Sequence, residues 1–234
     1  MPIFILPEQL AFPSPRLATP EGILAVGGDL SLERLLLAYS QGIFPWFSDE
    51  EPLLWWSPDP RLVLYPEELK VSKSLKKIIK QGRFHITADT AFDRVIKACS
   101  SVKRKNNEGT WIVDEMIKAY SLLHEAGFVH SIEAWYQGEL AGGLYGVSLG
   151  RCFFGESMFT RASNASKTAF VSLVEYLNRF SFDLIDCQVT TNHLLSLGAR
   201  EIPRSLFLEQ LQESLKIPAM KGKWTDTFRE FIKS

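Results

Sequence analysis

One short apolar stretch carries a carboxylate and is the first place to look for chemistry. Glu156 stands in the run FFGESMF that begins at Phe153. Ionising a carboxylate away from water is costly unless the charge is paired. If this run is extended, alternation puts Glu156 on one face with Phe154 and Met158, while Phe153 and Ser157 face the other way. The carboxylate then either serves a reaction or is a structural acid that pairs with an arginine or caps a helix.

A second polar pair lies in the strand-like run FDLIDCQV at 182–189. Asp186 and Gln188 project to one side of such a strand and Cys187 to the other. Buried polar groups need partners, so the pair bonds to itself or to a ligand. If this strand lies beside the one with Glu156, the two acids and the amide suit an amine, which they can hold and deprotonate. The alternative is a polar network that only orders the sheet.

Lysines give the clearest charge pattern of the chain. Four of them follow the i, i+3, i+4, i+7 spacing and therefore lie along one side of a helix predicted over 72–81, namely Lys73, Lys76, Lys77 and Lys80. Like charges on one helix face repel, so the stripe favours a polyanionic partner such as nucleic acid. A solvated helix face is the alternative.

Composition bounds the class of protein. With 234 residues, 46% hydrophobic and 23% charged, the chain is of ordinary globular type. The net charge of −1 gives no global attraction to nucleic acid, so any polyanion site must be local. Without a membrane-length apolar run or a basic leader, we expect a cytoplasmic protein with no membrane partner. The three cysteines lack CxxC spacing and are expected to be reduced, and the four scattered histidines predict no metal site.

The elements that would position these residues can be read from periodicity. Ser31 caps a helix that Gly42 ends, and the aromatic run IFPWF that follows is expected to be irregular, either a hydrophobic plug or a stacking platform for a base. Further helices are predicted over 90–101, up to Glu125, over 164–180 and over 206–215, and strands at 53–56, 61–65, 84–87, 130–135, 139–147, 152–156 and 182–189. Strands and helices in this order predict an α+β fold.

Several motifs together resemble one family. They are GIFPWF at 42–47, WWSPDPR at 55–61, GTWI at 109–112, FGESMF at 154–159, NASK at 164–167, IDCQ at 185–188, HL at 193–194 and SLGA at 196–199. In this order they are similar to the leucyl/phenylalanyl-tRNA–protein transferases, and the match covers nearly the whole chain up to the last helix.

The resemblance implies a fold and a function. A small N-terminal α/β domain over 1–62 is expected to precede a larger domain over 63–234 that resembles the GCN5-type N-acetyltransferase fold. The activity implied is transfer of Leu or Phe, with Met as a further possibility, from aminoacyl-tRNA to the N-terminal Arg or Lys of a protein, which marks that protein for degradation. An aminoacyl ester is already activated, so no cofactor is expected, and we expect a monomer.

The resemblance also implies roles for residues. Reacting groups would be Glu156, Asp186 and Gln188, and the lysine stripe would bind the tRNA acceptor stem. The substrate-binding residues would be Trp46 and Trp111 for the terminal adenosine, with Leu144, Phe153, Ser157 and Ile185 around the amino acid.

Two other functions compete with this one. An acyl-CoA-dependent N-acetyltransferase of the same fold would need a glycine-rich pyrophosphate loop, but Thr160–Ser163 before the predicted helix has no glycine. A non-catalytic tRNA-binding module would use the lysine stripe and the aromatic residues, but Glu156 and Asp186 would repel phosphate.

Overall fold

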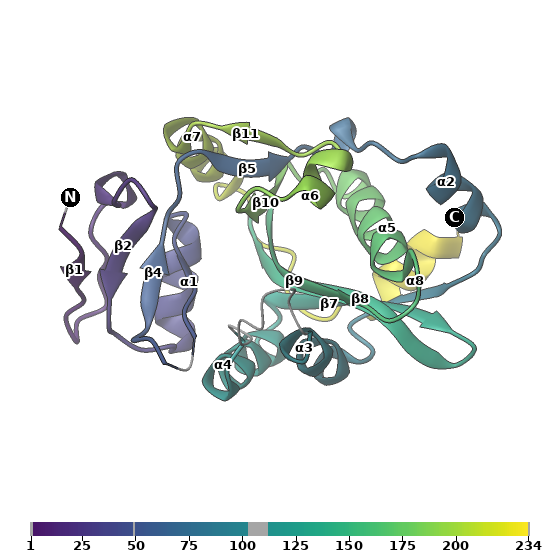
Figure 1. Ribbon diagram of the computed structural model, residues 1–234, viewed down its shortest axis with the longest axis horizontal. Helices are drawn as coiled ribbons and strands as arrows, with labels where there is room; N and C mark the ends of the chain where they lie inside the picture. Colours follow the sequence, from purple (N-terminus) through teal and green to yellow (C-terminus); the bar gives the residue numbers. More distant parts are fainter. Residues whose placement is uncertain (1, 49, 103–111, 234) are drawn as a thin grey trace.

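Two sheets organise the protein. The computed structural model describes residues 2–48, 50–102 and 112–233. A small sheet lies at the N-terminal end, and a larger one carries helices on both faces (Figure 1). The predicted α+β class, with a small N-terminal unit and a larger second one, is confirmed.

The small sheet has the strand order β1-β2-β4-β3. Its elements are β1 (Phe4–Ile5), the 3₁₀ helix η1 (Pro15–Leu17), β2 (Ile23–Val26), α1 (Leu32–Ser40), β3 (Phe44–Pro45) and β4 (Leu54–Trp56). The Ser31 hydroxyl accepts from the Arg34 amide at 3.4 Å, which confirms the predicted cap of α1. The expectation that the aromatic run is irregular is wrong for two residues, because β3 pairs with β4. Pro45 lacks an N–H, and the edge position of β3 tolerates that loss.

The large sheet has the order β11-β5-β10-β9-β8-β7-β6. Its strands are β5 (Arg61–Leu64), β6 (His85–Ala88), β7 (Val129–Tyr136), β8 (Glu139–Leu149), β9 (Cys152–Thr160), β10 (Leu184–Gln188) and β11 (Arg200–Ile202). β9 and β10 run parallel, whereas the other neighbouring strands are antiparallel. The two predicted polar strands are therefore direct neighbours.

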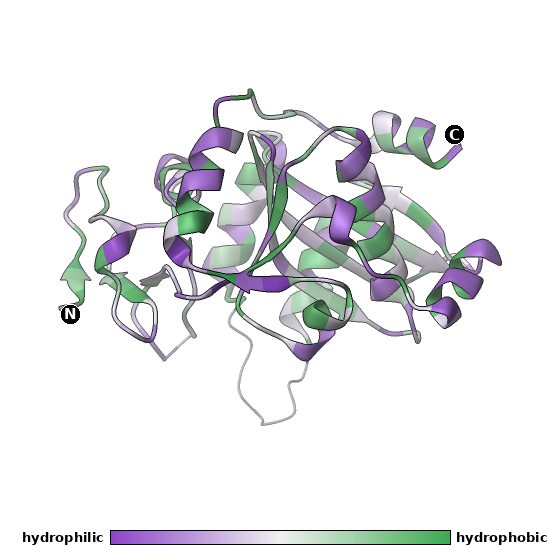
Figure 2. Cartoon of the chain, turned by 90° about the horizontal axis from the view of Figure 1, so that it is seen from above, coloured by the Kyte–Doolittle hydropathy of each residue, from purple (hydrophilic) through white to green (hydrophobic). Residues whose placement is uncertain are grey.

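Helices bury both faces of this sheet. The remaining elements are η2 (Pro66–Glu68), α2 (Lys73–Lys80), α3 (Phe92–Ser100), α4 (Asp114–Glu125), α5 (Ala165–Arg179), α6 (Asn192–Ser196), α7 (Arg204–Ser214) and α8 (Thr225–Lys233). Buried side chains between the sheet and helices α3 and α4, such as Ile96 and Phe154, form one core, the α3/α4 core, which also contains Trp55 of the small sheet. Those between the sheet and α5, such as Leu173 and Phe153, form the α5 core. In Figure 2 the helices carry both hydrophilic and hydrophobic segments, as amphipathic helices do.

The lysine helix forms as predicted. α2 begins after Ser72, whose hydroxyl accepts from the Leu75 amide at 3.3 Å, and Leu75 is buried. All four lysines of the stripe are exposed. No helix in the described part of the chain combines the length and the apolar character needed to cross a membrane.

The domain division near residue 62 stays a prediction. Arg61 and Leu62 begin β5, which belongs to the large sheet. The α3/α4 core takes side chains from both sheets, so the two units share buried apolar surface.

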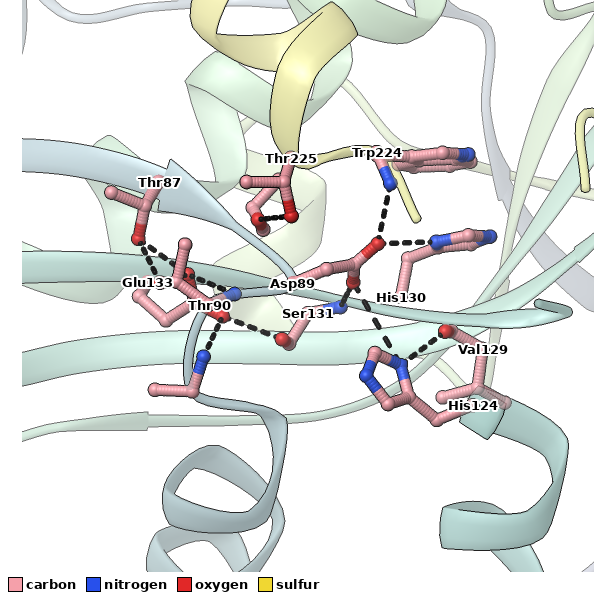
Figure 3. Close-up of polar contacts among 12 residues, drawn as sticks. Thr87, Asp89, Thr90, His124, Val129, His130, Ser131, Glu133, Trp224 and Thr225 are labelled. Atoms are coloured by element: carbon pink, nitrogen blue, oxygen red, sulfur yellow. Dashed lines mark hydrogen bonds and ion pairs between the residues drawn. The ribbon is translucent and has the colours of Figure 1, made fainter. Parts of the chain in front are cut away.

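A buried polar cluster ties the C-terminal segment to the sheet (Figure 3). The Asp89 carboxylate accepts from His130 Nδ1 at 2.8 Å, from the Ser131 amide at 2.9 Å and from the Trp224 amide at 2.8 Å. The Trp224 and His130 rings are stacked, with centroids 3.7 Å apart. Burial raises the pKa of Asp89, but the hydrogen bonds outweigh it and hold that pKa below its usual value. Asp89 thus joins β6, β7 and the start of α8.

We expect Asp89→Asn to lower the free energy of unfolding by about 3 kcal/mol, because an amide group then faces buried N–H donors that lose their acceptor. Asparagine tolerates the positive φ of 54° at this position, so backbone strain does not confound the result. The exposed Asp226→Asn on α8 is the control and should change stability by no more than about 0.5 kcal/mol. Equal urea midpoints for both variants would refute the role of Asp89.

Candidate active site

Glu156 lies at a bulge of β9. The register pairs Tyr145 with Ser157 and Gly146 with Gly155, which leaves Glu156 without a partner on β8. One extra residue on a strand bends it and turns the side chain there in a new direction. The carboxylate therefore has an orientation that regular strand geometry does not give.

The bulge overturns the predicted alternation. Phe154 belongs to the α3/α4 core, as does Phe159. Met158, expected on the same face as Phe154, packs instead against the α5 core. The expectation is wrong beyond Glu156 because the inserted residue shifts every later side chain to the opposite face.

Three donors surround the Glu156 carboxylate. Tyr39 Oη donates to Oε1 at 2.8 Å and Gln188 Nε2 to the same oxygen at 2.9 Å. Tyr120 Oη donates to Oε2 at 3.0 Å. The two tyrosine hydroxyls are also in hydrogen-bond contact with each other. Donors from α1, α4 and β10 thus converge on one acid of β9.

Burial sets the ionisation of this acid. Glu156 is only 8% exposed. Burial raises its pKa to about 7, although the hydrogen bonds from Tyr39, Tyr120 and Gln188 lower it. Burial also raises the pKa of both tyrosines well above its usual value, so they stay protonated. A carboxyl that titrates near neutral pH can both accept and return a proton under physiological conditions.

Asp186 is held by a buried arginine. Arg61 Nε donates to Asp186 Oδ1 at 2.8 Å and Nη2 donates to Oδ2 at 2.6 Å. Both residues are 0% exposed, and the guanidinium lies between the rings of Phe44 and Phe207, 4.9 and 4.6 Å from their centroids. The pair joins neighbouring strands β5 and β10. Both oxygens of the Asp186 carboxylate are therefore already paired with Arg61.

Gln188 is oriented by this ion pair. Its backbone N–H donates to Asp186 Oδ1 at 2.9 Å, and its φ of 63° is in the left-handed region. The register of β10 against β5 shifts between Asp186 and Gln188, which leaves Cys187 as an extra residue. The turn carries the Gln188 side chain to Glu156. Hydrogen bonds therefore link Arg61 to Asp186, Asp186 to the Gln188 backbone, and the Gln188 side chain to Glu156.

A cavity of about 370 Å³ opens beside Glu156 and Gln188. Its size falls in the range of small-molecule sites, about 300–1,000 Å³. Apolar side chains form most of its wall, among them Leu144, Phe153, Met158, Phe170, Leu173 and Ile185. The polar residues along it include Tyr145, Glu156, Ser157, Gln188, Thr191 and His193. An apolar group thus fits beside a proton acceptor and an amide.

The predicted residues divide into four groups. The cavity is lined by seven of them: Trp46, Leu144, Phe153, Glu156, Ser157, Ile185 and Gln188. Asp186 is not among the lining residues and contacts the cavity only through Gln188. Lys73, Lys76, Lys77 and Lys80 are on the surface of α2, and Trp111 lies outside the described residues. In the part of the chain that the structure describes, no three His, Cys, Asp or Glu side chains gather as metal ligands would.

Sequence reasoning missed three residues. Tyr39 and Tyr120 occupy apolar positions of helices and look like core residues in the sequence. Arg61 is the only charged residue of the short strand RLVL. That isolated cation was a usable signal, because a buried Asp186 needs a partner of opposite charge. Nothing in the sequence pointed to the tyrosines.

The fold and the site together are those of an enzyme. Its active site is an apolar cavity that ends at a titratable carboxyl and an amide. Sequence comparisons identify the family. The profile described as leucyl/phenylalanyl-tRNA protein transferase matches residues 63–212, and that of its N-terminal domain matches residues 28–59. The chain belongs to the leucyl/phenylalanyl-tRNA protein transferase family, as the sequence motifs predicted.

Curated relatives match nearly the whole chain. The leucyl/phenylalanyl-tRNA–protein transferase of Desulfatibacillum aliphaticivorans is 60% identical over 225 residues, which are 96% of this chain and 97% of the relative. That of Desulforapulum autotrophicum is 56% identical over 227 residues, 97% of this chain and 99% of the relative.

Solved structures are more distant. A functionally unknown conserved protein from Staphylococcus epidermidis has a TM-score of 0.40 at 9% identity, over 77% of this chain and 68% of that protein. L-PGS from Bacillus licheniformis has a TM-score of 0.37 at 12% identity, over 86% of this chain and 66% of that protein. The likeness of the larger unit to the acetyltransferase fold stays a prediction.

The raised pKa of Glu156 makes a prediction for stability. A carboxyl whose pKa rises from 4.5 to about 7 on folding stabilises the fold below pH 4.5, and this contribution is lost as the pH rises through 7. We expect Glu156→Gln to be more stable than the wild type at about pH 8, by up to about 3 kcal/mol, with a smaller difference at about pH 5. Urea unfolding at both pH values measures this.

The exposed Glu209→Gln on α7 serves as the control and should show no comparable pH dependence. If the stability difference between Glu156→Gln and the wild type is the same at both pH values, Glu156 does not titrate in this range.

Proposed function

We propose that this protein transfers a leucyl or phenylalanyl group from aminoacyl-tRNA to the N-terminal amino group of an acceptor protein. The acceptor begins with Arg or Lys, and the added residue marks it for degradation. Met is a further donor that the apolar cavity could hold. Apart from the family, the observation that carries this proposal is the pairing of Glu156 and Gln188 at the end of an apolar cavity.

The cavity suits the aminoacyl end of the tRNA. Leu144, Phe153 and Ile185 offer an apolar wall for the Leu or Phe side chain, which would leave its ester near Glu156. Trp46 lies at the same cavity, half-buried and packed on Trp56 with ring centroids 5.4 Å apart. We propose that its ring stacks on the terminal adenine, as aromatic side chains do with unpaired bases. The same role for Trp111 stays a prediction.

Orientation provides most of the catalysis in this mechanism. The ester is already activated, and an α-amino group with a pKa of about 7.7–8.0 is partly unprotonated near neutral pH. Holding the amine against the ester carbonyl converts a bimolecular step into an effectively unimolecular one. The reaction as we propose it needs no ATP, metal or covalent enzyme intermediate.

The polar residues have separate roles in this proposal. Glu156 holds the unprotonated amine and takes the surplus proton from its nitrogen during attack on the ester. Gln188 orients the amine or polarises the ester, because an amide is not itself a strong base. Asp186 does not touch the substrate. It positions Gln188 by accepting from the backbone N–H of Gln188.

We propose a monomer that works in the cytoplasm. Its donor, an aminoacyl-tRNA, belongs to that compartment. The three cysteines are buried and unpaired, which agrees with a reducing environment.

The first test is transfer itself. Purified protein should move labelled Phe from Phe-tRNA to a peptide that begins with Arg, and should not acetylate that peptide with acetyl-CoA. Glu156→Gln and Gln188→Ala should each slow transfer by about 10²-fold or more, in line with the loss of a proton acceptor or an orienting group. Near-normal rates in both variants would reject these roles. Acetylation would favour the acyl-CoA alternative, and tRNA binding without transfer would favour the binding module.

The second test concerns the lysine stripe. If Lys73, Lys76, Lys77 and Lys80 bind phosphates, removing one of these charges should reduce the slope of log affinity for tRNA against log salt by about 0.7–0.9. The variant Lys76→Gln/Lys77→Gln should therefore bind tRNA more weakly and with a shallower slope.

The matched control neutralises two exposed lysines on other elements, Lys118→Gln on α4 and Lys216→Gln after α7. Its slope should stay near the wild-type value. A wild-type slope in the α2 variant would remove the stripe from the tRNA interface.

A further inference from the structure

Three oxygen-bearing side chains close a ring at the end of the cavity. Tyr39 of α1 and Tyr120 of α4 each donate to one oxygen of Glu156, at 2.8 and 3.0 Å, and their hydroxyls meet each other. Both tyrosines are 0% exposed. Only Glu156 of the three lines the cavity. Tyr39 and Tyr120 belong to the α3/α4 core, so the ring connects that core to the cavity.

The number of protons in this ring depends on Glu156. Three contacts between oxygens require three protons if each contact is a hydrogen bond. The tyrosines supply two, so with Glu156 ionised one contact has no hydrogen. A protonated Glu156 supplies the third, and all bonds can then run in one direction, from Glu156 to Tyr39, from Tyr39 to Tyr120 and back to Glu156. Gln188 donates to Oε1 in either state.

We propose that Tyr39 and Tyr120 make Glu156 a reversible one-proton store for the transfer reaction. This rests on the proposed function. As the amine nitrogen bonds to the ester carbonyl carbon, ionised Glu156 takes the surplus proton from that nitrogen. When the bond from the carbonyl carbon to the tRNA 3′-oxygen breaks, Glu156 returns the proton to that oxygen. The products are an amide and a free hydroxyl, and the ring ends as it began. Tyr39 and Tyr120 are positioning residues, since they act through Glu156.

Other titratable groups around this site are deeply buried or paired. Tyr145 of β8 also faces it, and burial raises the pKa of that tyrosine well above its usual value. Burial raises the pKa of Cys99 on α3 to about 12. Asp186 of β10 is paired with Arg61 of β5.

His193 of α6 is a further titratable group at the cavity. Burial and the nearby Lys167 lower its pKa. The experiment must therefore separate this histidine from Glu156.

The test compares pH profiles of kcat/KM for Phe transfer in the wild type, Tyr39→Phe and Tyr120→Phe. The hydrogen bonds from Tyr39 and Tyr120 lower the pKa of Glu156, because a bond to a carboxylate is stronger than one to a neutral carboxyl. Opening the ring also removes bonds of the protonated form, but these are the weaker ones, so losing a tyrosine donor costs the ionised form more. The acid limb should therefore move to higher pH by about one unit. In the double variant Tyr39→Phe/Tyr120→Phe, the second substitution should shift the acid limb by less than the first, because both hydroxyls act on one acid.

Matched controls isolate the ring. Tyr176 is another tyrosine with 0% exposure, and its hydroxyl bonds Thr227 at 2.7 Å, away from Glu156. Tyr176→Phe should therefore leave the acid limb in place. The shift caused by Tyr39→Phe should persist in a His193→Asn background. A tyrosine that only supports the fold would lower the rate equally at every pH.

Carbon-13 NMR measures the pKa of the Glu156 carboxyl without any turnover. The signal is assigned by its absence in Glu156→Gln. We expect the same upward shift in Tyr39→Phe. If the wild type transfers no Phe, the proposed function fails, and the titration still tests the ring. If the wild type transfers Phe but the profiles of the tyrosine variants overlay its own after scaling, or the NMR shift is absent, the proton-store proposal is overturned alone.

Discussion

The buried ion pair between Arg61 and Asp186 is the interaction on which the rest of the site depends. Two opposite charges, both without solvent exposure, link β5 to β10, the neighbour of β9. Desolvating such charges is expensive, and the bidentate geometry with stacked Phe44 and Phe207 offsets that cost. Because Asp186 also accepts from the Gln188 amide, the pair fixes the end of β10 at the angle from which Gln188 reaches Glu156.

A second constraint is the balance between burial and hydrogen bonding at Glu156. Burial alone would keep this carboxyl protonated, while the donors Tyr39, Tyr120 and Gln188 favour its ionised form. The two effects leave the pKa at about 7, where either form is accessible. A more apolar surrounding would remove the acceptor, and a more polar one would leave it with little affinity for a proton. The tyrosines and the apolar wall therefore set the pKa of Glu156 together.

The departures from regular structure coincide with the functional residues. Glu156 is the inserted residue of β9, and β10 shifts register just before Gln188, whose φ is positive. A regular strand would direct these side chains along the alternating faces, into the cores that cover the sheet. Local rules of sequence and structure tend to fail at functional sites, since geometry there serves a ligand as well as the fold.

What the sequence determined was local or carried by motifs: the family, the α+β class, the helix at Lys73–Lys80 with its cap Ser72, and the two strands that carry Glu156 and Gln188. Only the tertiary structure decided that these strands are neighbours, that Met158 leaves the face of Phe154, that Arg61 neutralises Asp186, and that Tyr39 and Tyr120 meet at Glu156. Caps and helical periodicity depend on residues a few positions apart. Bulges and buried partners depend on strands and helices far away in the chain, whose register no local pattern encodes.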